Sequence, residues 1–191
     1  MNDCPYSEKL LEWATMAHYG ELSFKDSAWV LGETETRWWL RSAGGLYTLT
    51  KNDRGGEERF IMEAADIEDV ERYLITLFGF GIRSDHGLRM ISGTGVVPEG
   101  VNPAYHLREV AWAKVAVINT ITNQTRVIIR GGLGTSASDA TEFSWIADAS
   151  LEDLRASYLD PDGLPLFPGC QTIQDPAIRA KVERAQGRPI P

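Results

Sequence analysis

The sequence predicts the α+β class, with one largely antiparallel β-sheet and about three α-helices packed against it. Three observations lead to this prediction. Residues 59–88, RFIMEAADIEDVERYLITLFGFGIRSDHGL, change from the alternating pattern of a strand to the pattern of a helix. Strand-like segments on both sides of it are separated by turn sequences. Ser7, Asp66 and Ser150 each precede a helical pattern and can cap a helix.

The central segment, 59–88, contains a strand and then a capped helix. Phe60 and Met62 lie two residues apart, as expected for one buried face of a strand. Asp66 can accept hydrogen bonds from the first free amides of the helix. Gly79 stands where a left-handed residue would end this helix, and Gly81 disfavours a restart. The apolar side of the helix is expected to consist of Ile67, Val70, Leu74, Leu77 and Phe78.

The N-terminal part predicts one helix followed by β-structure. Ser7 can cap a helix that runs to about Ala17. The apolar side of that helix is Leu10, Leu11, Ala14 and Ala17. Four strands are expected, at 28–31, 37–41, 46–50 and 59–63. Gly44 and Gly45 can adopt the positive φ values of a tight hairpin turn.

The C-terminal part predicts a second hairpin, a further strand and a third helix. The hairpin joins 112–119 to 125–130 through a polar turn, with Arg126 and Arg130 pointing away from the buried face. That buried face is expected to contain Val115, Val117, Val127 and Ile129. The next strand carries Phe143 and Trp145 on one face, and Ser150 caps the third helix. Residues 60–74 and 143–159 resemble each other, so both are expected to form strand–helix units.

Length and composition indicate one globular domain spanning 1–191, with a proline-rich tail from about residue 160. The formal net charge of −8 argues against binding to nucleic acid or to an anionic membrane, and it suits a basic partner. No apolar run is long enough to span a bilayer, and the N-terminus does not resemble a signal peptide. Cys4 and Cys170 make no disulfide framework and are expected to stay reduced. These features favour a cytoplasmic protein.

The residues with catalytic or ligand-binding potential form no recognisable enzyme motif. The three histidines and two cysteines lack metal-ligand spacing, so neither a metal nor a cofactor is expected. The loop that contains Gly131, Gly132 and Gly134 could cradle a phosphate through its backbone amides. It matches neither the Walker spacing nor GxGxxG, which favours a simple turn. Taken alone, these residues identify no reaction.

One strand instead suggests a surface that binds another protein. Trp38 and Trp39 are adjacent, so their side chains leave opposite faces of the strand. If Trp38 points to the core, Trp39 lies between Arg37 and Arg41, and aromatic and arginine side chains are enriched at interface hot spots. The alternative is that a helix buries Trp39. The acidic loop residues Asp53, Glu57 and Glu58 would complement a basic surface on a partner.

Three segments also resemble a family of actinobacterial immunity proteins, which includes antitoxins against secreted NAD glycohydrolases. They are EWATMAHYG near the N-terminus, the hairpin RWWLRSAGGLYTLT and the run VERYLITLFGFGIRSDHGL. The resemblance is clearest at Glu71, Arg72, Tyr73, Leu74, Gly79, Arg83 and Leu88. These residues look like determinants of the fold, and we do not assign them as toxin contacts.

The resemblance implies a cytoplasmic antitoxin without catalytic activity, which binds the catalytic domain of a cognate toxin and occludes its active site. The residues expected to contact the toxin are Trp39, Asp53, Glu57, Glu58, Gly131, Gly132 and Gly134. Two other classes stay open. One is an enzyme or a nucleotide- or small-molecule-binding protein that uses the loop at 131–134, and the other is a scaffolding module that associates with itself.

Overall fold

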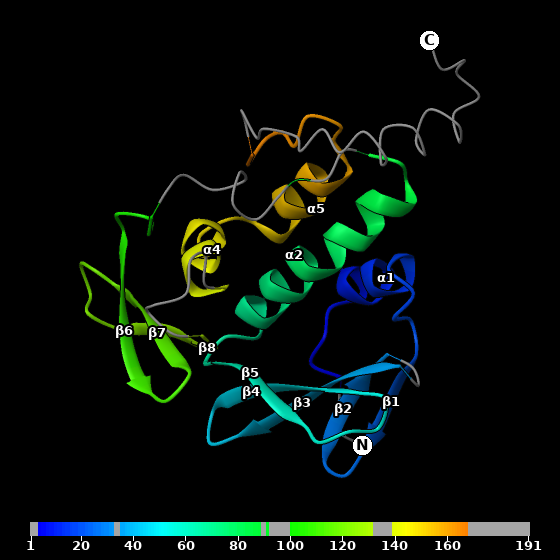
Figure 1. Ribbon diagram of the computed structural model, residues 1–191, viewed down its shortest axis with the longest axis horizontal. Helices are drawn as coiled ribbons and strands as arrows, with labels where there is room; N and C mark the ends of the chain where they lie inside the picture. Colours follow the sequence, from blue (N-terminus) through cyan, green and yellow to red (C-terminus); the bar gives the residue numbers. More distant parts are fainter. Residues whose placement is uncertain (1–3, 33–34, 89–90, 92–99, 132–138, 168–191) are drawn as a thin grey trace.

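The computed structural model describes residues 4–32, 35–88, 91, 100–131 and 139–167. Figure 1 shows a layer of helices over one face of a β-sheet. The helices are α1 (Glu8–Met16), α2 (Ile67–Asp85), α4 (Asp139–Ile146) and α5 (Leu151–Leu159). The strands are β1 (Leu22–Lys25), β2 (Ala28–Leu31), β3 (Thr36–Ala43), β4 (Leu46–Asp53), β5 (Arg59–Ala64), β6 (Tyr105–Ala111), β7 (Lys114–Asn119) and β8 (Thr125–Arg130). Among the helices within these ranges, none is both long enough and apolar enough to cross a membrane.

The eight strands form one sheet in the order β1-β2-β3-β4-β5-β8-β7-β6, and every pair is antiparallel. The first five strands form a meander, and β8 joins it at the sheet centre by pairing with β5. The predicted α+β class is therefore confirmed. The turn at Gly44 and Gly45, with φ values of 61° and 80°, is also confirmed.

Helix α2 crosses the sheet as the centre of the helical layer (Figure 1). Asp66 caps it as predicted, since its carboxylate accepts the amide of Glu68 at 3.0 Å. The predicted stop at Gly79 is wrong, because α2 continues to Asp85. The left-handed residue is Gly87, two positions beyond the end of the helix; it has a φ of 64° and its amide donates to the carbonyl oxygen of Ser84 at 3.1 Å. Gly79 has a packing role, described in the Discussion.

Two of the residues in which the sequence resembles immunity proteins, Glu71 and Arg83, hold helices of the fold together. Glu71, only 2% exposed, accepts both the amide and the hydroxyl of Ser7, at 2.5 and 2.8 Å, and so joins α2 to the start of α1. Arg83 is fully buried and donates to carbonyl oxygens at the end of α5 and just beyond it. These acceptors belong to Ser157, Tyr158, Asp160 and Pro161. A positive charge there also suits the negative end of the α5 dipole.

Two predictions for the C-terminal half are wrong. Residues 139–146 form the helix α4 and not a strand, so the supposed strand–helix repeat is absent. Its buried positions Ala140, Phe143 and Ser144 follow helical spacing. Arg126 does not point away from the helices, because β8 has one extra residue between the positions paired with Val117 and Ile118. Such a bulge interrupts the alternation of side chains.

Three strands of the sheet also differ from the prediction. The edge strands β1 and β6 were not expected from the sequence, and β7 begins at Lys114 because Trp112 and Ala113 form the turn between β6 and β7. Val115, Val117, Val127 and Ile129 are buried, as predicted.

The first residues of the proline-rich tail, 160–167, form turns that place Phe167 against Tyr158, with ring centroids 5.4 Å apart. Cys170 and the rest of the tail beyond residue 167 lie outside the described residues.

Candidate partner-binding surfaces

Trp39, predicted as an exposed anchor, is buried: only 6% of it is accessible. Trp38 and Leu40 point to the main core as expected, and Trp39 lies on the opposite face in a small cluster with Ala28 and Val30. Its indole N–H donates to the side-chain oxygen of Asn52 at 3.1 Å. The indole is thus not an exposed anchor in the free protein, and its contact with a partner stays a prediction. Neighbouring side chains bury it, and the register of β3 against β4 brings them there.

Arg41 covers Trp39 and also binds one of the predicted acidic contact residues. Its guanidinium lies 5.5 Å from the centroid of the Trp39 ring. The same group donates to both carboxylate oxygens of Glu58, at 2.6 and 2.9 Å. This bidentate pair, with a further hydrogen bond from Thr50, lowers the pKa of Glu58. The charge of Glu58 is thus offset within the protein.

The negative charge of Asp53 is likewise offset by basic residues of the same chain. Glu57, in contrast, is exposed in the turn between β4 and β5. The carboxylate of Asp53 accepts the hydroxyl of Thr36 at 2.9 Å and pairs with Lys51 at 3.1 Å and with Arg59. These contacts lower the pKa of Asp53, and the hydrogen bond from Thr36 contributes most. The three predicted acids therefore do not form a negative surface of their own.

Gly131 lies at the end of β8, and its amide donates to the carbonyl oxygen of Ala113 at 3.0 Å. Gly132 and Gly134 lie outside the described residues. Beside Gly131 is a cavity of about 290 Å³, which we call the basic pocket. Its lining is Arg59, Phe60, Trp112, Ala113, Lys114 and Arg130. The Lys114 ammonium lies 3.9 Å from the centroid of the Phe60 ring, and Trp112 is 92% exposed.

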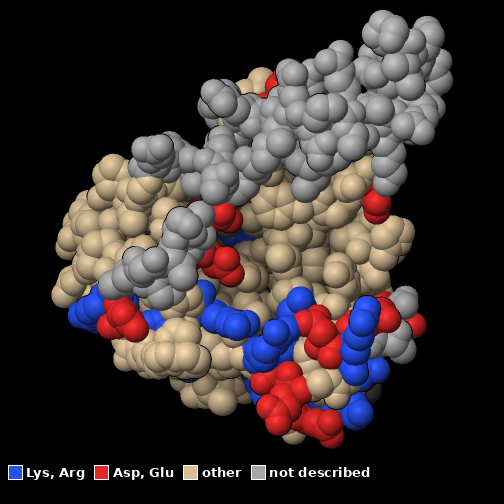
Figure 2. All heavy atoms as spheres, in the orientation of Figure 1, with Lys and Arg blue, Asp and Glu red and all other residues tan. Residues whose placement is uncertain are grey.

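Charge is distributed unequally between the two layers. Residues 139–167, which form α4, α5 and the turns around them, contain seven Asp and Glu but a single Arg. Residues 105–131, which form β6 to β8, contain four Lys and Arg but a single Glu. In Figure 2 blue and red atoms mix over the strands at the bottom, whereas the helical part above shows red atoms and few blue ones. Most of the net negative charge therefore lies on α4, α5 and the turns around them, since the acids of β1 to β5 are largely balanced by Lys and Arg.

A groove between α2 and α4 opens on this acidic layer, with a volume of about 120 Å³; we call it the acidic groove. Helix α2 contributes Tyr73, Thr76, Leu77 and Phe80, and α4 contributes Asp139, Glu142, Phe143 and Ile146. The Tyr73 hydroxyl donates to the Asp139 carboxylate at 3.1 Å. Burial raises the pKa of Glu142, and the nearby charge of Asp139 raises it further.

The acidic groove was not predicted from the sequence, although the wall that α2 contributes has a recognisable sequence pattern. Tyr73, Leu77 and Phe80 follow helical spacing and form a second apolar stripe on α2. The other wall was hidden, because the alternation of Phe143 and Trp145 was interpreted as a strand. Only as a helix does this segment place Asp139, Glu142 and Phe143 in one groove.

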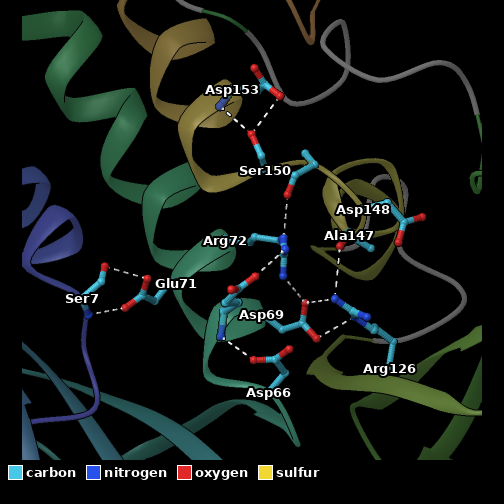
Figure 3. Close-up of polar contacts among 12 residues, drawn as sticks. Ser7, Asp66, Asp69, Glu71, Arg72, Arg126, Ala147, Asp148, Ser150 and Asp153 are labelled. Carbon is cyan, nitrogen blue, oxygen red and sulfur yellow. Dashed lines mark hydrogen bonds and ion pairs between the residues drawn. The ribbon is translucent and has the colours of Figure 1, made fainter.

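A cluster of ion pairs around Asp69 fixes α2 to the rest of the protein (Figure 3). Asp69, 1% exposed, pairs with Arg72 of the same helix at 2.9 Å and with Arg126 of β8 at 2.7 Å. Arg72 donates to the carbonyl oxygen of Ala149 at 2.8 Å. Burial raises the pKa of Asp69, and the two guanidinium groups oppose that rise. The cluster joins α2, β8 and the turn between α4 and α5.

A search of the described residues finds no group of three or more His, Cys, Asp or Glu side chains that could hold a metal ion. The basic pocket and the acidic groove both have charged side chains in their lining, whereas a third cavity, of about 320 Å³ and lined by Phe24, Trp29 and Tyr47 among others, has none. The first suits an anion, and the second suits a cation.

Comparison with known proteins identifies the family. The sequence profile described as "Immunity protein 61" matches residues 13–166. "Immunity factor for TNT" of Mycobacterium tuberculosis and its homolog in Mycobacterium bovis are each 29% identical over 133 residues, covering 70% of this chain and 73% of each relative. The solved structure of Rv3902c from M. tuberculosis superposes with a TM-score of 0.71 at 26% identity, covering 85% of this chain and 94% of that one.

The matched region contains every described helix except α1, of which it contains the second half, and every described strand. The resemblance noted in the sequence is thereby confirmed, and it extends into the C-terminal half. The chain belongs to the immunity protein 61 family.

Proposed function

We propose that this chain is an antitoxin that binds the catalytic domain of a cognate secreted toxin and blocks its active site. The toxin is expected to be an NAD glycohydrolase, as the resemblance noted in the sequence implies. The chain acts by contact, without catalysis of its own, in the cytoplasm of the cell that makes the toxin. Two relatives are named as immunity factors for TNT, which supports a target of the same kind.

The observation that carries this proposal, within the family, is the concentration of acidic residues on the helical layer. A toxin site that binds NAD must accommodate two phosphate groups, so its surroundings are expected to be positive. A surface with seven Asp and Glu against one Arg, as in residues 139–167, is attracted to such a site. The sheet loops fit less well, because Asp53 and Glu58 are already paired with basic residues of this chain.

Co-purification tests the proposal directly. The tagged full chain and the untagged catalytic domain of the toxin encoded beside it are mixed and separated by size-exclusion chromatography. A shared peak at equal stoichiometry, together with loss of NAD hydrolysis in that peak, is the expected result. A toxin domain that elutes separately and stays active beside excess chain contradicts it.

The basic pocket favours a second function, the binding of a nucleotide or another small anion. Arg59, Lys114 and Arg130 supply positive charge, and Phe60 with Trp112 supply aromatic faces on which a base could stack. Its volume of about 290 Å³ is near the lower end of the range for small-molecule sites. Under this alternative, ATP, ADP or NAD raises the melting temperature of the chain, and Lys114→Gln removes the shift. No shift with any of these ligands contradicts the alternative.

A further inference from the structure

We propose that the acidic groove is the socket for one lysine or arginine side chain of the toxin, which makes α2 and α4 the centre of the interface. This inference rests on the proposed antitoxin function. It goes further by naming the surface and the chemistry of the group that enters it.

The shape of the groove suits one long side chain. Its walls are the apolar faces of Leu77, Phe80, Phe143 and Ile146, which can cover the methylene stem of lysine or arginine. The volume of about 120 Å³ is well below the roughly 300–1,000 Å³ of sites that bind drug-sized molecules. A single side chain therefore fits where a nucleotide does not.

The charge of the groove specifies a cation. Asp139 and Glu142 both face it, and neither forms an ion pair with a Lys or Arg of the described residues. Partial burial raises the pKa of Glu142, and repulsion by the charge of Asp139 raises it further. An ammonium or guanidinium group between them relieves this repulsion. An acidic or phosphorylated ligand would increase it.

A hydrogen-bond acceptor inside the groove is also unused. The hydroxyl oxygen of Thr76 is shielded from solvent and has no partner within the described structure. Buried hydroxyl groups without a partner are uncommon in proteins, and each has an energetic cost. Because this oxygen is shielded even from water, a guanidinium or ammonium group becomes its donor only when the Thr76 side chain turns towards the groove on binding. Shape and charge thus favour the same occupant, and Thr76 offers it a further hydrogen bond.

The first test measures binding of the toxin catalytic domain to the full chain by isothermal titration calorimetry. The double variant Asp139→Asn/Glu142→Gln keeps the shape of the groove and removes its charge. A Kd raised about tenfold or more is expected, as for loss of an interface hot spot. The matched control Glu21→Gln/Glu109→Gln removes the same charge from two exposed acids elsewhere and is expected to change Kd less than about threefold. Equal effects of the two double variants overturn the inference.

A further variant separates binding from folding. Thr76→Val keeps the size of the side chain and removes the unpaired hydroxyl, so it is expected to leave the melting temperature unchanged or raised. If the hydroxyl accepts a hydrogen bond from the toxin, the same variant weakens binding severalfold. A Thr76→Val protein that binds the toxin as tightly as the wild type counts against the inference.

The second test needs no toxin and so distinguishes failure of the inference from failure of the proposed function. The full chain is titrated with N-acetyl-arginine amide and, as a neutral match, with N-acetyl-citrulline amide, while methyl NMR signals are followed. The arginine compound is expected to shift Leu77 and Ile146, and the shift disappears in Asp139→Asn/Glu142→Gln. Equal shifts with both compounds, or none at these methyl groups, overturn the inference even if the toxin is inhibited.

Discussion

The ring of Tyr158 on α5 occupies the space that a β-carbon at position 79 of α2 would need. A β-carbon built on Gly79 would lie 2.4, 2.5 and 2.8 Å from three atoms of that ring. Tyr158 is itself buried, at 1% exposure, and its ring packs against Phe80 and Phe167. Glycine is therefore required here for close contact between two helices, and not for a turn.

Replacing Gly79 with alanine is expected to destabilise the protein by about 1–3 kcal/mol, because overpacking outweighs the better helix propensity of alanine. The matched variant is Gly81→Ala in the same helix, where a β-carbon would meet nothing within 4 Å. That variant is expected to gain up to about 1 kcal/mol. Urea denaturation followed by circular dichroism measures both. Equal effects of the two substitutions would refute this role for Gly79.

Replacing Asp69 with asparagine is expected to cost about 3 kcal/mol, since it leaves two guanidinium groups without their shared counter-charge. Arg72 is buried and Arg126 is about one-third exposed, so Arg72 carries most of this effect. Glu68→Gln, which removes an exposed partner of the same Arg72, is expected to cost about 0.5 kcal/mol or less. The free energies of unfolding of both variants check this order, and a reversed order would contradict it.

Replacing Trp39 with phenylalanine is expected to lower stability by about 1–3 kcal/mol, because the buried side chain of Asn52 loses its indole donor. The same substitution at Trp112, which is 92% exposed, is expected to change stability by less than about 0.5 kcal/mol. Thermal unfolding distinguishes the two positions. A stable Trp39→Phe protein with weakened toxin binding would identify Trp39 as a direct contact.

Stability is expected to fall at alkaline pH, partly because of Tyr105. Burial and the hydrogen bond to Asp148 raise the pKa of Tyr105 to about 12. The unfolded chain releases this proton first, near pH 10, so the contribution is complete below pH 10 and is lost as the pH rises towards 12. Tyr105→Phe is expected to be less stable at pH 8 and to lose less stability between pH 9 and 11. Parallel pH profiles for the two proteins would contradict this account.

The local part of the fold could be predicted from the sequence. Ser7, Asp66 and Ser150 cap helices as expected, because capping depends on a side chain and amides two or three residues away. The turn at Gly44 and Gly45 was equally predictable, because positive φ values at both positions are a local requirement.

The errors arise where distant contacts decide the structure. The role of Gly79 depends on Tyr158, which is nearly eighty residues away in the sequence. Arg126 points towards Asp69 because of a β-bulge that no local sequence pattern predicts. Burial of Trp39 likewise needs Asn52 and Arg41 to meet across β3 and β4. The predicted acids were correctly placed near the surface, but their partners Arg41 and Arg59 could not be assigned without the strand register.

The most direct test of the central claim is a titration of toxin activity. NAD hydrolysis by the toxin catalytic domain is measured at a fixed concentration while the full chain is added in steps. The account predicts a linear fall to no activity at one chain per toxin molecule, with inhibition weakened by saturating NAD. Full activity in the presence of excess chain, or hydrolysis of NAD by the chain alone, would contradict it.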